Sequence, residues 1–93
     1  METTSDIVIG QIVKSKAGRD KGRIFLVTNI LDDKFVEIVD GDLRKIDSPK
    51  KKKIRHLIVY NSTIKDYKAK IENGDKINNA YVRKILDAYN KEI

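Results

Sequence analysis

The side chains of this sequence that could do chemistry are mainly basic, and they are concentrated in two segments. Residues 14–23 contain five Lys or Arg and one Asp, and residues 44–56 contain seven Lys or Arg and one Asp. The rest of the chain holds 8 basic and 12 acidic residues, so these segments carry more than the whole net charge of +6. Such clustering is typical of a surface that binds a polyanion. A solvated surface without a partner is the alternative for either segment alone.

The first basic segment contains a short loop, AGRDKGR, bracketed by Gly18 and Gly22. Glycine tolerates positive φ without a steric penalty, which predicts a tight loop with Arg19 and Lys21 side by side at its tip. An arginine can contact a phosphate in a bidentate manner, and a lysine can contact it as a point charge. The spacing alone is equally compatible with a polar hairpin loop whose charge is incidental.

The second basic segment contains four consecutive lysines, Lys50–Lys53, directly after Pro49. Adjacent ammonium groups repel one another unless they are solvated or neutralised, and proline disfavours a regular strand ladder. We therefore expect a flexible, unburied arm that releases counterions from a nucleic-acid backbone. Lysine runs can also act as nuclear import signals. Binding to an anionic membrane is a further alternative, but no helix here pairs a wide apolar face with a basic one.

The remaining composition argues against catalysis and against metal or cofactor binding. The 93 residues contain no cysteine and one histidine, which excludes disulfides, thiol nucleophiles and zinc fingers. The Asp40-Gly41-Asp42 sequence lacks the further oxygen ligands of a calcium loop and predicts a turn. No nucleophile and base can be assembled, so we expect no enzyme, no cofactor, no metal site and no small-molecule substrate. Neither a signal peptide nor a membrane span is visible, and the expected location is the cytoplasm.

The first sixty residues read as short strands separated by turns. Short strands with tight connections favour a small antiparallel barrel over a parallel sheet. The five expected strands are Gly10–Ser15, Arg23–Leu31, Phe35–Asp40, Leu43–Ile46 and Ile54–Tyr60. In the second of them, residues 24–27 are all apolar, which predicts that both faces are covered. One face would meet the barrel core, and the other needs a lid.

The last thirty residues supply that lid as two helices. The apolar spacing of Ile64, Tyr67 and Ile71 predicts one helix, capped by Ser62 or Thr63 and ended by Gly74. A second helix is expected from about residue 79 to residue 90, with Asn78 as its cap. Its apolar stripe consists of Val82, Ile85, Leu86 and Tyr89.

The segment GQIVKSKAGRDKGRIFLVTNI, residues 10–30, resembles the KOW motif of ribosomal proteins and transcription elongation factors. Together with DGDLRK, PKKKK and the tail INNAYVRKIL, it resembles bacterial KOW-domain RNA-binding proteins, which are similar to KOW-type large-subunit ribosomal proteins of archaea and eukaryotes. Where the KOW pattern commonly has a second glycine, this sequence has Phe25. The resemblance implies a five-stranded SH3-like barrel over residues 1–61, followed by a two-helix extension over residues 62–93 packed on it as a single folding unit.

The expected function is binding of structured RNA, most specifically ribosomal RNA, by a monomeric, ribosome-associated protein of translation. No exposed aromatic pair is apparent on adjacent strands. The protein would therefore recognise the shape and the phosphates of the RNA rather than stack its bases on aromatic side chains. The alternative is a protein-interaction module that docks on the transcription or translation machinery. The predicted RNA-binding residues are Lys14, Lys16, Arg19, Lys21, Arg23, Arg44, Lys45, Lys50, Lys51, Lys52, Lys53 and Arg55.

Overall fold

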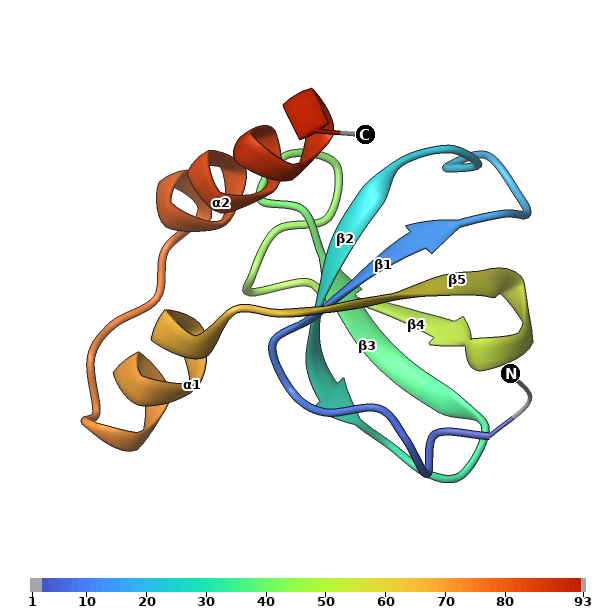
Figure 1. Ribbon diagram of the computed structural model, residues 1–93, viewed down its shortest axis with the longest axis horizontal. Helices are drawn as coiled ribbons and strands as arrows, with labels where there is room; N and C mark the ends of the chain where they lie inside the picture. Colours follow the sequence, from blue (N-terminus) through green and yellow to red (C-terminus); the bar gives the residue numbers. More distant parts are fainter. Residues whose placement is uncertain (1–2, 93) are drawn as a thin grey trace.

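The computed structural model describes residues 3–92, apart from the side chains of residues 61, 62, 65 and 90–92. It is a curled antiparallel sheet of five strands that forms a half-barrel, followed by two helices (Figure 1). The strands lie in the order β4-β3-β2-β1-β5. Their bounds are Gln11–Ser15 (β1), Ile24–Ile30 (β2), Phe35–Val39 (β3), Lys50–Lys53 (β4) and Leu57–Thr63 (β5). A 3₁₀ turn, η1 (Ile54–His56), precedes β5, and the helices are α1 (Lys65–Glu72) and α2 (Asn79–Glu92).

Strand β2 is covered on both faces, as its unbroken apolar sequence predicts. Phe25 and Val27 point into the half-barrel, whereas Ile24 and Leu26 point outward to the helices. Phe25 is fully buried, so its ring is part of the core. The inner core consists of Ile7, Val13, Phe25, Val27, Val36, Ile38, Ile54 and Leu57. The outer core consists of Ile12, Ile24, Leu26, Val39, Tyr67, Val82 and Leu86.

The helices begin and end largely where their cap residues predict. The Asn78 side chain accepts a hydrogen bond of 2.8 Å from the Tyr81 amide and so caps α2. Gly74 has φ +76° and ends α1, with the Asp75 amide donating back to the Lys70 carbonyl. The expected cap of α1 is wrong, because the helix starts one residue later, at an Ile64 cap position without a side-chain hydrogen bond.

The fourth strand lies elsewhere than predicted. Residues 43–46 form a bend and the start of a turn rather than a strand, because the Asp40 carboxylate accepts the amides of Asp42 and Arg44 and closes the chain on itself there. The next part of the loop is fastened to α2, since the Ile46 amide donates to the Asn79 side chain at 2.9 Å. This segment therefore holds the helix against the sheet instead of extending the sheet.

The four lysines themselves form the fourth strand, and the expected flexible arm is wrong. Residues 50–53 pair antiparallel with β3, with Lys52 opposite Val36 and Lys50 opposite Ile38. Pro49 lies just before the strand, and β4 is an edge of the sheet, so the missing proline amide costs no ladder hydrogen bond. The repulsion between adjacent ammonium groups is relieved because successive side chains leave opposite faces of a strand.

Candidate nucleic-acid interface

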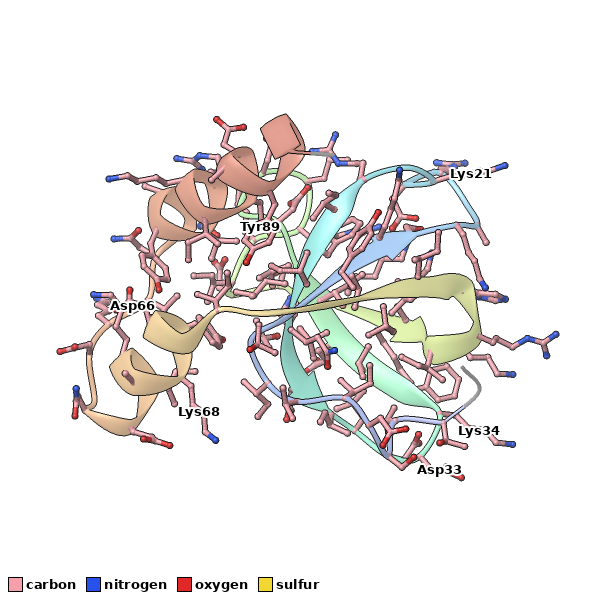
Figure 2. All side chains as sticks on the ribbon, in the orientation of Figure 1. Lys21, Asp33, Lys34, Asp66, Lys68 and Tyr89 are labelled. Atoms are coloured by element: carbon pink, nitrogen blue, oxygen red, sulfur yellow. The ribbon has the colours of Figure 1, made fainter. Side chains whose placement is uncertain are left out.

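The loop between β1 and β2 is short and tied to itself by backbone hydrogen bonds. Gly18 and Gly22 have φ values of +85° and +90°, which confirms the positive φ predicted for both glycines. The Gly22 amide donates to the Ser15 carbonyl at 2.7 Å, and the Lys21 amide donates to the Gly18 carbonyl at 3.3 Å. Figure 2 shows Lys21 at the outer end of this loop, on the far side of the molecule from α1. Arg19 and Lys21 are both exposed.

Asp20, between those two cations, points inward and joins the loop to β4. Its carboxylate accepts a hydrogen bond of 2.7 Å from Ser15 and one of 3.0 Å from the ammonium group of Lys52. Its other oxygen lies 3.2 Å from the ammonium nitrogen of Lys50. Burial of Asp20 opposes its ionisation, but the hydrogen bond from Ser15 and the contacts with both lysines outweigh that penalty. They lower the pKa of Asp20 from 3.8 to about 2.

Lys52 is the most buried of the four lysines, with only 8% of its side chain exposed. Besides Asp20, its ammonium group donates to the Ala17 carbonyl at 2.9 Å. These interactions of Lys52 therefore hold the loop between β1 and β2 against β4. A lysine is suited to this role because its long apolar stem can be buried while its ammonium group reaches a charged partner. Lys50 and Lys52 thus act first as supports of the loop.

Lys51 and Lys53 leave the opposite face of β4. Their ammonium groups lie 4.5 Å and 5.9 Å from the ring centroid of Phe35 on the neighbouring strand. Such cation–π contacts restrain a lysine without neutralising its charge. Among the side chains that the structure describes, these two lysines form no ion pair, so they present positive charge to solvent.

The two basic segments, which are separated by twenty residues in sequence, meet at one end of the half-barrel. Besides the Asp20 contacts, the Lys16 amide donates to the His56 carbonyl at 3.0 Å and brings η1 beside the loop. Arg55 and His56 are exposed there. The resulting basic surface is defined by Lys16, Arg19, Lys21, Lys51, Lys53 and Arg55.

The other predicted site residues lie outside this basic surface. Arg23 donates through two guanidinium nitrogens, at 2.9 Å and 3.2 Å, to the Asp40 carboxylate, and one of them lies 3.4 Å from Asp42. Lys14 is half-buried and pairs with Ile24 in the β1–β2 ladder. Arg44 and Lys45 are exposed in the loop between β3 and β4.

Sequence reasoning missed Asp20 and Ser15, on which the geometry of the loop depends. The available signal was that Asp20 is the single acidic residue within a basic segment, where a carboxylate is expected to have a cationic partner. Its partner Lys52 lies 32 residues away, so the pairing required the strand register.

An acidic turn borders the basic surface where β2 meets β3. The Asp32 carboxylate accepts the amides of Lys34 and Phe35, each at 2.8 Å, and these hydrogen bonds lower the pKa of Asp32. Figure 2 places Asp33 and Lys34 at the same turn. An anionic ligand on the basic surface would therefore be repelled at this border.

Comparison with known proteins adds no family assignment: no family model matches the chain, and no curated protein matches it significantly. Within residues 3–92, no helix is long and apolar enough to cross a membrane. In the same residues, no three His, Asp or Glu side chains are grouped in a way that would hold a metal ion.

Proposed function

We propose that this protein binds structured RNA, ribosomal RNA in particular, and acts in association with the ribosome in the cytoplasm. The observation that carries the proposal is the junction of the two basic segments through Asp20, Lys50 and Lys52. It gathers exposed cations from distant parts of the chain on one restrained surface. Restraint before binding lowers the entropy lost when long side chains meet phosphates.

The charges on this surface suit a phosphate backbone. Arg19, Lys21 and Lys51 are exposed, and no described side chain forms an ion pair with them. The resemblance of residues 10–30 to the KOW motif supports the same proposal and an SH3-like barrel, since KOW domains commonly contact RNA through this loop. Structured RNA is favoured over extended single strands because Phe25 is fully buried and Phe35 lies under lysines, so neither ring is open for a base to stack on.

The test is the salt dependence of binding to a structured ribosomal RNA fragment. If about four to six phosphates are contacted, a plot of log affinity against log salt should have a slope of about −3 to −5. Replacing Arg19→Gln together with Lys21→Gln should reduce both affinity and slope. The matched control, Lys68→Gln with Lys84→Gln, removes the same charge from exposed helix positions and should change neither.

A flat salt profile, or equal losses in the two double variants, would contradict the proposal. It would favour the alternative of a protein-interaction module that docks on the transcription or translation machinery. In that case binding would depend on apolar contacts, which salt screens little.

A further inference from the structure

A hollow of about 340 Å³ adjoins the basic surface and is formed by three separate segments. The loop between β1 and β2 contributes Arg19 and Asp20, the loop before β4 contributes Leu43 and Arg44, and β4 contributes Lys50. Three cations and one apolar side chain therefore line a space of the size at which small-ligand sites begin.

The single carboxylate in this lining does not neutralise the arginines. Asp20 is only 5% exposed: its Oδ1 accepts hydrogen bonds from Ser15 and Lys52, and its Oδ2, which accepts no hydrogen bond, forms an ion pair with Lys50. Among the described side chains, neither Arg19 nor Arg44 forms an ion pair. Two guanidinium groups are thus available to an anion, and planar guanidinium groups are well matched to phosphate.

Leu43 gives the hollow an apolar surface beside these charges. It is 60% exposed, the highest value among the exposed large hydrophobic residues of the described chain. Its turn is nonetheless well fixed, because the Arg44 carbonyl accepts the amides of Asp40 and Gly41 at 2.9 Å and 3.1 Å. An apolar side chain held in solvent on a rigid turn is suited to contact a base.

We propose that this hollow binds one unpaired nucleotide of the RNA, with its phosphate held by Arg19 and Arg44 and its base resting on Leu43. A paired base is stacked within its helix and cannot reach such a surface, whereas a bulged base can. The inference rests on the proposed function and refines it: the preferred RNA is a helix that carries a bulge, and Leu43 is a residue that selects it.

The test compares two RNA hairpins with the same stem, one of which carries a single bulged adenosine. The wild-type protein should bind the bulged hairpin about fivefold more tightly, because partial burial of one leucine side chain against a base contributes about 1 kcal/mol. Leu43→Ser should abolish this preference and change the affinity for the unbulged hairpin less than twofold, because no charge is altered. Leu31→Ser, the control, replaces another exposed leucine outside the hollow and should retain the preference. Circular dichroism checks the folding of both variants.

The outcomes separate this inference from the proposed function. Equal affinity of the wild-type protein for both hairpins would overturn the nucleotide site while leaving RNA binding in place. Absence of binding to either hairpin at low salt would overturn RNA binding itself. Adenosine monophosphate at about 1 mM should not displace the bulged hairpin, since one phosphate releases few counterions. Its displacement would show a site for free nucleotides and overturn the inference.

Discussion

Asp20 is the residue on which the shape of the basic surface depends. The effect of its ionisation can be tested by measuring the stability of the protein as a function of pH. Its folded pKa of about 2 lies below its ordinary value of 3.8. The ionised carboxylate therefore stabilises the fold above the unfolded pKa, and this contribution is lost as pH falls toward 2. It amounts to about 2 kcal/mol at neutral pH.

We therefore expect Asp20→Asn to lower the free energy of unfolding by about 2 kcal/mol at pH 7. The difference from the wild-type protein should stay constant down to about pH 5 and shrink between about pH 4 and pH 2. Urea denaturation at a series of pH values measures it. A difference that is absent at pH 7, or unchanged at pH 2, would show that the Asp20 ion pairs do not stabilise the fold.

At the scale of elements, β4 divides its lysines between two roles according to the face they occupy. Lys52→Gln should destabilise the protein by about 2 kcal/mol, because it removes a buried partner of Asp20. Lys51→Gln should change stability by less than about 0.5 kcal/mol, because its side chain is exposed. The same variant should reduce the salt slope of RNA binding by about 0.7 to 0.9.

Thermal melting and RNA titration of the two single variants separate these roles. Since both substitutions remove one charge from adjacent residues of one strand, each serves as the control for the other. If Lys51→Gln lowered the melting temperature and Lys52→Gln did not, the register of β4 described above would be wrong.

The packing of α2 on the sheet depends on Gly41, whose φ is +78°. A Cβ atom there would overlap the Asn79 carbonyl in the first turn of α2 and crowd Arg83, which donates to the Gly41 carbonyl at 2.6 Å. Gly41→Ala should therefore cost about 2 to 3 kcal/mol of stability, from strain and overlap together.

The matched control is Gly74→Ala, at φ +76° with no atom within 4 Å of the added Cβ. It carries only the backbone strain, about 1 kcal/mol. Equal losses in the two variants, measured by urea denaturation, would show that α2 does not press on Gly41.

Local sequence patterns predicted most of the helices and strands, because the residues within or next to each element indicate its type or its ends. Asn78 and Gly74 mark helix ends, and the unbroken apolar run of β2 indicated a lid. The fourth strand could not be predicted, because a run of four lysines has no alternation in residue type. Successive lysines of this strand differ only in the residues that they contact: Asp20 on one face of the strand and Phe35 on the other. Those partners are brought in by tertiary folding, as are the Asp40 contacts that engage Arg23.

At the scale of the whole molecule, the two ends of the fold have different compositions and different roles. The helices cover the outer face of the sheet through Tyr67, Val82 and Leu86. Within the described residues, exposed cations without an ion pair lie around the loop between β1 and β2, where Figure 2 labels Lys21, and also on the helices, where it labels Lys68. An RNA that binds the basic surface is expected to approach from the loop end and leave the helices uncovered.

The most direct measurement is ultraviolet crosslinking in cells, with the attached RNA sequenced and the crosslinked peptides identified by mass spectrometry. We predict ribosomal RNA reads concentrated at one structured region, with crosslinks in residues 16–21, 43–45 and 51–55. A variant with Arg19→Gln and Lys21→Gln should lose most of this signal, and Lys68→Gln with Lys84→Gln should retain it. Recovery of no RNA above background, or crosslinks confined to α1 and α2, would contradict the account.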